Sequence, residues 1–527
     1  MADLRRGLWE HCLAAARQIA HDHATTAAGL KGCGAPLIDL LRRQAAQILL
    51  LQEDDRDSKD VRLVARRLDD LVELAHARFY AFRPSDVPAC WRQLYTDASI
   101  LLFSLRWWQR RANRAPLSDD DLDGLVRPLD MALILAGGAG PPRRGRDWIH
   151  ATLETLHRVL QDEEPDAVDD DNDGDDDEAR PRKKPRREPD IVKRHAGVFP
   201  IPDFSAGPFF NEGDSSSSSC SPSSSSKCQF VPPIRHPVPR SGPLGMEAFQ
   251  AYLDYGGAGF AAAAAANCKP LVLSGMLDLW PARQKTARPW SSPAYLRWRT
   301  LRGRRLVPVE VGRSYVDDGW TQSIVPFATV LEELESASED PTRKKKTGPM
   351  YLAQHALFTQ MPMLQQDISI PDACYTTTTM DSDSDDDDNV IDGHVLTNAW
   401  LGPPGTITPL HTDPHHNLLA QVVGRKYVRL YAPEQTEALR PRGREAGGVD
   451  MGNTSTVDVG VMEGWDKAEG GEGDEGEGVG SAEAAAFRAV PYVDCILEPG
   501  DTLYIPQGWW HYVRGLSVSF SVSFWWN

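Results

Sequence analysis

The spacing of apolar residues changes partway along the chain, and this change limits the possible folds more than any other feature. Up to about residue 162, apolar residues recur three and four positions apart, as in 37–51 and 61–82. That spacing is the period of an amphipathic helix. At 516–526 the sequence LSVSFSVSFWW instead alternates apolar residues with serine, which predicts a strand with one face toward the core. We expect a multidomain α+β protein that begins with an all-α domain of about five or six helices at 1–162.

The segment at 163–234 separates these two parts and differs from both in composition. It holds an Asp-rich run, a basic run from Arg180 to Arg187 and a serine tract at 215–226. Such a segment buries too little apolar area to offset the entropy of ordering it, so we predict a disordered linker. The basic run is typical of a nuclear localisation signal or of a nucleic-acid-binding tail. We expect the nucleus, the cytoplasm or both. The alternative is that it balances the charge of the acidic run.

The part of the chain at 235–527 contains short segments typical of strands, separated by turn residues. They are 269–275, 305–312, 417–424, 426–432, 501–506 and 516–526. Several short strands indicate a β-barrel or a two-sheet jelly roll rather than a parallel sheet. Low-complexity stretches near 376–393 and 440–486 interrupt the pattern, and we predict that they are loops inserted between strands.

The formal net charge of -18 is concentrated in a few stretches. Residues 162–178, 381–392 and 463–483 contain 12, 7 and 8 acidic residues and a single base, Lys467. These stretches carry -26, so the remaining residues carry +8. We expect the acidic stretches to be disordered and to attract a basic protein partner, an effect that salt would screen. No pattern typical of sequence-specific nucleic acid binding is evident.

Two further features bear on the cellular compartment. The eight cysteines include no C-x-x-C pair, so neither a zinc ribbon nor a disulfide framework is indicated. No run approaches the ~18 apolar residues of a membrane span, and the N-terminal residues lack the apolar core of a signal peptide. We therefore expect a soluble intracellular protein with reduced thiols.

The segment from Gly405 to Asn417 contains the strongest candidate for a metal site. His411 and Asp413 are two residues apart, so in a strand both side chains point to one face. His511 follows a later strand and a turn, and closure of a barrel would bring it close to this pair. Two histidines and one carboxylate leave coordination positions open, as in non-haem Fe(II) oxygenases. The alternative is a surface pair, since His415 and His416 are also close by.

Lys426 indicates the same site independently. In the strand at 426–431 it shares a face with Val428 and Leu430, while the alternate residues face the other way. Burial of an ammonium group without a partner is costly, so we infer an anion inside the barrel. A dicarboxylate cosubstrate, bound to the metal by one end, would supply it. The alternative is an edge lysine whose side chain extends to water.

Three segments resemble the jumonji-C (JmjC) family of 2-oxoglutarate- and iron-dependent oxygenases: 351–360 (YLAQHALFTQ), 398–435 and 504–527. The resemblance covers about 235–527 without the inserts, and VPVEVG at 307–312 adds to it. Within the family, the segments are most similar to the branch described as arginyl hydroxylases and lysine demethylases. The resemblance implies a double-stranded β-helix, which is a jelly-roll, cupin-like catalytic domain.

The resemblance also implies roles for ten residues. The implied iron ligands are His411, Asp413 and His511. The residues implied to bind 2-oxoglutarate are Lys426, Tyr351 and Thr408 at the distal carboxylate, with Asn417 and Trp400 lining the pocket. Glu310 and Trp320 match positions that face the substrate, where a carboxylate beside an aromatic ring suits a guanidinium group. The alternatives are that Trp400 belongs to the core and that Glu310 pairs with a structural arginine.

Three functional hypotheses follow. The first is an oxygenase that uses Fe(II), O2 and 2-oxoglutarate to hydroxylate a side chain of a protein substrate, which we expect to be arginine, with release of succinate. The second is a histone N-methyl-lysine demethylase, because a hydroxylated N-methyl group leaves as formaldehyde. The third is a non-catalytic chromatin or protein-interaction module, in which the helical domain and the linker act.

Overall fold

The structure, a computed structural model of the chain, describes most of the helical and β-rich parts. The described residues are 2–21, 29–52, 58–83, 86–111, 115–163, 230–255, 268–284, 288–317, 319–339, 348–376, 394–444, 450–467 and 481–527. The basic run at Arg180–Arg187, nearly all of the expected linker and most of the insert near 376–393 lie outside them. The expectations for those segments therefore stay predictions.

The first part of the chain is all-helical, as the periodicity predicts. Its six described α-helices are α1 (Ala2–His21), α2 (Ala35–Leu49), α3 (Lys59–Phe79), α4 (Ala89–Arg111), α5 (Asp119–Ala136) and α6 (Arg146–Glu163). Helix α4 lies in the core of this region, with Phe103, Trp107 and Trp108 fully buried. We call α1–α6 the helical region.

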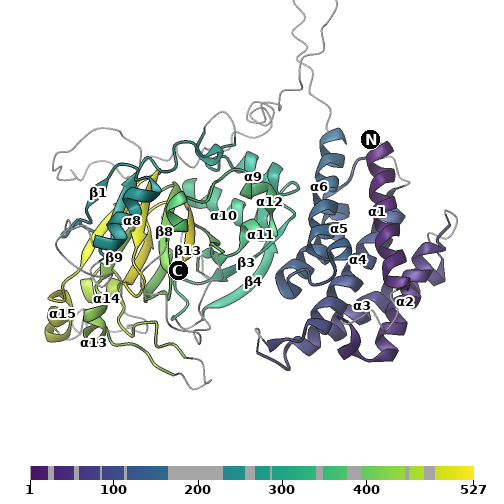
Figure 1. Ribbon diagram of the computed structural model, residues 1–527, viewed down its shortest axis with the longest axis horizontal. Helices are drawn as coiled ribbons and strands as arrows, with labels where there is room; N and C mark the ends of the chain where they lie inside the picture. The colour runs from purple at the N-terminus through teal and green to yellow at the C-terminus, as the bar shows by residue number, and fades with distance from the viewer. Residues whose placement is uncertain are drawn as a thin grey trace, which may run out of the picture.

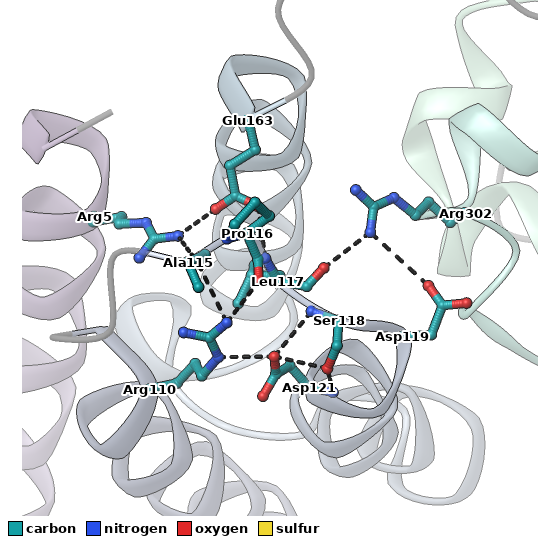
Figure 2. Close-up of polar contacts among 10 residues, drawn as sticks. All are labelled: Arg5, Arg110, Ala115, Pro116, Leu117, Ser118, Asp119, Asp121, Glu163 and Arg302. Atoms are coloured by element: carbon teal, nitrogen blue, oxygen red, sulfur yellow. Dashed lines mark hydrogen bonds and ion pairs between the residues drawn. The ribbon is translucent and has the colours of Figure 1, made fainter.

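A polar cluster fixes the connection between α4 and α5 (Figure 2). Ser118 caps α5, and its side chain and backbone exchange hydrogen bonds with Asp121 in a capping box, which satisfies the free N–H groups of a helix start. Arg110 of α4 pairs with Asp121 at 2.8 Å. Glu163 pairs with Arg5 of α1 and accepts a hydrogen bond of 2.8 Å from the Leu117 backbone N–H. Glu163 was expected in the linker, but it is the last residue of α6 and ties three parts of the helical region together.

The rest of the chain is built around two β-sheets (Figure 1). The larger sheet has nine strands, in the order β1 (Arg240–Ser241), β2 (Leu271–Ser274), β11 (Asp501–Ile505), β8 (His416–Val423), β13 (Ser519–Trp526), β6 (Leu396–Gly402), β5 (Met350–His355), β3 (Leu306–Val311) and β4 (Thr321–Pro326). The smaller sheet has four, in the order β10 (Val493–Leu497), β9 (Lys426–Tyr431), β12 (Trp510–Gly515) and β7 (Ile407–His411). All the pairings are antiparallel except β1 with β2. The predicted α+β class, a helical region followed by a two-sheet domain, is confirmed.

Helices cover one face of the larger sheet, and the smaller sheet packs against the other. The covering helices are α8 (Met246–Tyr255), α9 (Pro293–Arg299), α10 (Phe327–Glu339), α11 (Leu357–Gln360) and α12 (Pro362–Gln365). Their core includes Phe249, Trp290 and Phe327. Between the sheets, Leu419 and Leu503 of the larger sheet pack with Val428 and Leu430 of the smaller one.

Strand β13 is buried on both faces. Phe520, Val522 and Phe524 pack toward the covering helices, which is the core-facing side that the alternation predicts. The serines of the opposite face are also fully buried, and Ser523 accepts a hydrogen bond of 2.9 Å from the Trp400 indole N–H. The serine face thus points into the space between the sheets, where small polar side chains leave room.

The insert near 440–486 is partly folded, contrary to the expectation of a loop. Its described part contains α14 (Val459–Glu463) and α15 (Ser481–Arg488), and it follows the short helix α13 (Thr436–Leu439). Val459 and Met462 join the core around Tyr431. Glu463, expected in a disordered acidic stretch, is buried and pairs with Arg429 at 2.6 Å. The few apolar residues of this insert are separated by glycine and acidic residues, so the overall composition of the insert did not predict that they join a core.

Two chemical expectations can be compared with the described residues. None of the helices in the described ranges is long and apolar enough to cross a membrane. The six cysteines that the structure describes are all free and buried. Cys33 and Cys90 are neighbours, with the Cys33 thiol donating to the Cys90 carbonyl at 3.2 Å.

Candidate metal and cosubstrate site

Two neighbouring strands of the smaller sheet place the histidines side by side. His411 ends β7 and is the register partner of His511 on β12, and their ring centroids are 4.1 Å apart. Asp413 lies two residues past the end of β7 rather than in the strand. Its carboxylate nevertheless faces both rings, with Oδ1 3.7 Å from His411 Nε2 and Oδ2 3.4 Å from His511 Nε2.

Backbone carbonyls orient both imidazoles. Nδ1 of His411 is 2.8 Å from the Pro409 carbonyl, and Nδ1 of His511 is 3.0 Å from the Trp509 carbonyl. Because a carbonyl only accepts, each Nδ1 carries the proton and each Nε2 presents its lone pair to the site. Metal-binding histidines are oriented in this way by the hydrogen bond of the other ring nitrogen.

The protonation states also suit a cation. Burial, with the neighbouring His511, lowers the pKa of His411 to about 4, so the ring is neutral at pH 7. Burial raises the pKa of Asp413, but the interactions with the two facing histidines, chiefly His511, more than offset this, and the pKa is lower than usual. Neutral imidazoles and an ionised carboxylate are the forms that bind metal.

Among the described residues, only His411, Asp413 and His511 form a group of candidate ligands close enough for one ion. Their ligand atoms lie within 4.8 Å of one another, and their side chains are 10%, 11% and 4% exposed. Such a set fits one face of an Fe(II) coordination octahedron and leaves positions open. His415 and His416 are turned to other partners, Asn527 Oδ1 and the Tyr504 hydroxyl.

Lys426 is buried between the sheets. Its side chain is 1% exposed and donates to the Tyr351 hydroxyl at 3.2 Å. Nζ also lies 5.5 Å and 5.9 Å from the ring centroids of Tyr351 and Trp400. No carboxylate of the described residues pairs with it, and burial lowers its pKa to about 7. The alternative of a lysine extending to water is therefore excluded, and the ammonium form of a lysine buried in this way is costly without an anion beside it.

Four further candidate residues come from four different strands, and two of them, Tyr351 and Trp400, contact Lys426. Tyr351 comes from β5, Trp400 from β6, Thr408 from β7 and Asn417 from β8. Burial raises the pKa of Tyr351, which the adjacent Thr408 side chain partly offsets, so the phenol stays protonated as a donor. The Asn417 side chain is buried, and its Oδ1 has no hydrogen-bond partner in the described part of the protein.

The candidate substrate residues lie at the edge of the larger sheet. Glu310 of β3 is the register partner of Tyr351, and Trp320 directly precedes β4. Burial raises the pKa of Glu310, and the Trp320 side chain partly offsets the shift. No basic side chain among the described residues pairs with this carboxylate, so a structural arginine does not explain it.

The sequence analysis missed two residues at the site. The partly buried Tyr315 lies close enough to Glu310 and Asp413 for both charges to raise its pKa, although burial is the larger cause. Its hydroxyl is 3.3 Å from the Thr454 hydroxyl, and Thr454 is the bridge partner of His411. Tyr315 could have been found, because it follows Glu310 by five residues. Thr454 gave no signal, because it lies in the insert that composition marked as a loop.

Comparison with known proteins places this site in a family. The family model described as a cupin-like domain matches residues 258–527, just over half of the chain. The chain is 42% identical over 259 residues to lysine-specific demethylase 8 of Danio rerio, and 37% identical over 259 residues to Jumonji C domain-containing protein 5 of Drosophila melanogaster. The chain belongs to the cupin-like JmjC family. The JmjC resemblance of the sequence segments is thus confirmed.

The family model covers most of the two-sheet domain. The matches to the fish and fly proteins cover 49% of this JmjC chain, and 53% and 55% of the relatives, so the chain spans about half the length of those relatives. A human protein named bifunctional peptidase and (3S)-lysyl hydroxylase JMJD7 is 24% identical over 280 residues, which are 49% of this chain and 77% of that protein. These comparisons concern whole segments, so the roles of single residues rest on the geometry.

Proposed function

We propose that the protein is a 2-oxoglutarate- and Fe(II)-dependent oxygenase that hydroxylates an arginine side chain of a protein substrate. One observation carries most of this proposal: a buried lysine that has no counter-ion among the described residues lies in the same sandwich as a His-Asp-His group. A dicarboxylate cosubstrate satisfies both, because one end can chelate the metal while the other neutralises Lys426.

The residues of the chain would bind and orient the reactants. His411, Asp413 and His511 would hold Fe(II), which with 2-oxoglutarate and O2 supplies the oxidation of a C–H bond, with succinate and CO2 as co-products. Lys426, with the hydroxyls of Tyr351 and Thr408, would bind the distal carboxylate through charge-assisted hydrogen bonds. The apolar side chains between the sheets would exclude water from this pocket.

The substrate side of the site favours a cation that donates hydrogen bonds. Glu310 is partly buried and has no basic partner among the described residues, with Tyr315 and Trp320 nearby. A guanidinium group satisfies a carboxylate with two N–H donors and stacks on aromatic rings. The name of the human relative shows that side-chain hydroxylation occurs among the similar proteins.

An N-methyl-lysine demethylase is the second candidate. The names of the fish protein and of lysine-specific demethylase JMJ30 of Arabidopsis thaliana, 39% identical over 259 residues, favour it. Aromatic residues such as Tyr315 and Trp320 also suit a methylammonium group. The carboxylate of Glu310 favours arginine, because a fully methylated ammonium group has no N–H to donate.

We further propose a basic protein partner and action in the nucleus. Both rest on sequence: the acidic stretches would attract basic segments, and Arg180–Arg187 would act as the localisation signal. A non-catalytic role in chromatin binding would leave the buried Lys426 and the metal-binding geometry without a purpose.

Mass spectrometry of candidate peptides tests the proposal. The full chain is incubated with Fe(II), 2-oxoglutarate, O2 and peptides that carry either arginine or N-methyl-lysine. Addition of one oxygen atom to arginine is the expected result. Loss of a methyl group from lysine would instead support the demethylase. No peptide change and no succinate, in a preparation shown to bind the metal, would contradict both.

A further inference from the structure

The helical region is joined to the two-sheet domain by a short segment that follows α9. Leu301, Arg302 and Gly303 have φ angles of 54°, 57° and 79°. Left-handed backbone is unfavourable for leucine and arginine, so tertiary contacts must hold it. The side chain of Leu301 is 2% exposed and belongs to the hydrophobic core of the helical region. The strained backbone thus inserts a leucine of the two-sheet domain into the other region.

Partly exposed ion pairs surround this inserted leucine. Arg302 donates to the Leu117 carbonyl at 3.0 Å and lies 3.9 Å from Asp119 (Figure 2). Arg304 pairs with Asp119 and, at 3.3 Å, with Asp123. Pairs of this kind contribute little to stability because water screens them.

A buried ion pair lies next to them. Asp130 of α5 is fully buried and accepts two hydrogen bonds of 2.9 Å from Arg305 Nε and one of 2.7 Å from Arg305 Nη2. The same carboxylate accepts a hydrogen bond of 2.7 Å from the backbone N–H of Leu306, the first residue of β3. The helical region therefore supplies the group that fixes the start of a strand in the other region.

A second branch runs from Asp130 to β5. Gln360 of α11 donates to Asp130 Oδ1 at 3.2 Å and to the Leu306 carbonyl at 2.8 Å. Its Oε1 accepts a hydrogen bond of 2.6 Å from His355 Nε2, and His355 is the last residue of β5. One carboxylate thus holds the start of β3 directly and the end of β5 through one glutamine.

These two strands carry facing residues of the candidate site. Glu310 of β3 and Tyr351 of β5 are register partners. We propose that Asp130 is a positioning residue, which holds β3 and β5 so that Glu310 faces the substrate and Tyr351 faces the cosubstrate. The helical region is then part of the architecture of the site. The roles of Glu310 and Tyr351 in this proposal rest on the proposed function, whereas the contacts of Asp130 are independent of it.

Asp130→Asn in the full chain tests the proposal, with Asp123→Asn as the matched control at the same interface. Hydrogen exchange should become about tenfold faster in Leu306–Val311 and Met350–His355 of Asp130→Asn and change less than about twofold in β9 and β12. Binding of 2-oxoglutarate with Mn(II) in place of iron, measured by calorimetry without O2, should weaken about tenfold. In turnover, KM for 2-oxoglutarate should rise more than kcat falls. Asp123→Asn should match the parent protein in every measurement.

A second variant keeps the test decisive if Asp130→Asn does not fold. Gln360→Met leaves the Asp130–Arg305 pair and the Leu306 N–H bond to Asp130 intact, but it removes the Gln360 bonds to His355 and to the Leu306 carbonyl. Exchange should therefore increase more in β5 than in β3. Hydrogen exchange in β3 and β5 that is the same in the variants as in the parent protein would overturn the proposal. A uniform increase of exchange throughout the molecule would overturn it as well. If the parent binds no 2-oxoglutarate, the proposed function fails, and the exchange pattern still decides whether Asp130 holds the two strands.

Discussion

The two sheets contribute different chemistry to one site. The smaller sheet carries the groups that would hold the reactants of the oxidation: His411, His511 and Lys426. The larger sheet carries side chains that would shape the pocket and meet the substrate, among them Glu310 and Trp400. Every residue of β7 and β9 is buried, whereas β4, at the edge of the larger sheet, has no buried residue.

The difference indicates a division of labour. Reaction chemistry requires ligands held to a fraction of an ångström, and strands buried along their whole length supply that rigidity. Substrate recognition tolerates a more exposed strand at the edge of a sheet, provided that other parts of the protein hold that strand in place. Here the helical region gives that support through Asp130 at the start of β3. Substitution of His411, His511 or Lys426 on the smaller sheet should therefore remove chemistry, whereas substitution of Glu310 near the edge of the larger sheet should change only what is recognised.

The largest effect is expected for His411→Ala. Loss of one of three metal ligands should reduce iron-dependent turnover by about a thousandfold or more, while the circular dichroism spectrum stays that of the parent protein. His415→Ala is the matched control, because His415 is a buried histidine of the same turn that lies outside the candidate ligand group. Full activity of His411→Ala would remove this residue from the metal site.

The next largest effect is expected for Lys426→Met. Loss of the counter-charge should raise the Kd of 2-oxoglutarate roughly 30-fold, which corresponds to about 2 kcal/mol for a charge-assisted hydrogen bond. Without cosubstrate the same variant should melt at a higher temperature than the parent, because the cost of burying an ammonium group is gone. The exposed Lys269 gives the control, and Lys269→Met should change neither quantity. A lower melting temperature together with an unchanged Kd would refute the assignment.

The pH dependence of Lys426 has a definite sign. Its pKa is lowered from 10.5 to about 7 by burial, so between these values the unfolded chain binds a proton that the folded chain lacks. Stability of the parent protein should therefore rise with pH across that window relative to Lys426→Met. Affinity for 2-oxoglutarate should fall as the pH rises above about 7, because the free enzyme loses the ammonium charge. Thermal melts and calorimetry of both proteins from pH 6 to pH 10 would check both signs, whereas parallel curves would contradict them.

A smaller effect is expected on the larger sheet. Glu310→Gln should raise KM for an arginine peptide about tenfold, because a neutral amide replaces the carboxylate that meets the guanidinium group. KM for 2-oxoglutarate should stay within about twofold, as it should in the exposed control Glu437→Gln. Steady-state kinetics with each substrate varied in turn would measure both KM values. A change confined to KM for 2-oxoglutarate would contradict the assignment of Glu310 to the peptide substrate.

The two sheets also differ in how well the sequence predicted them. On the smaller sheet, spacing and alternation identified His411, Asp413 and Lys426, because a metal ligand set and a charge on an apolar face are unusual patterns. On the larger sheet, the resemblance was needed for Tyr351 and Glu310, because a lone tyrosine or glutamate in a strand has no local signature.

What the sequence could not predict depends on contacts between distant segments. The buried face of Ser519–Ser523 resembles a solvent-exposed face in a strand pattern, and only the presence of the second sheet reveals that it is interior. Asp130 resembles any helical aspartate until Arg305, distant in the sequence, is placed against it. The fold of Val459–Glu463 was hidden by the glycine and acidic residues around it. In each case the deciding partner is tertiary, and no local pattern encodes it.

Succinate release without any peptide tests the division of labour most directly. Parent protein, His411→Ala and Glu310→Gln are each supplied with Fe(II), 2-oxoglutarate and O2, and succinate is quantified over time. Glu310→Gln should release succinate within about twofold of the parent rate, and His411→Ala should release none above background. Loss of peptide-independent succinate in Glu310→Gln, or its persistence in His411→Ala, would contradict the account.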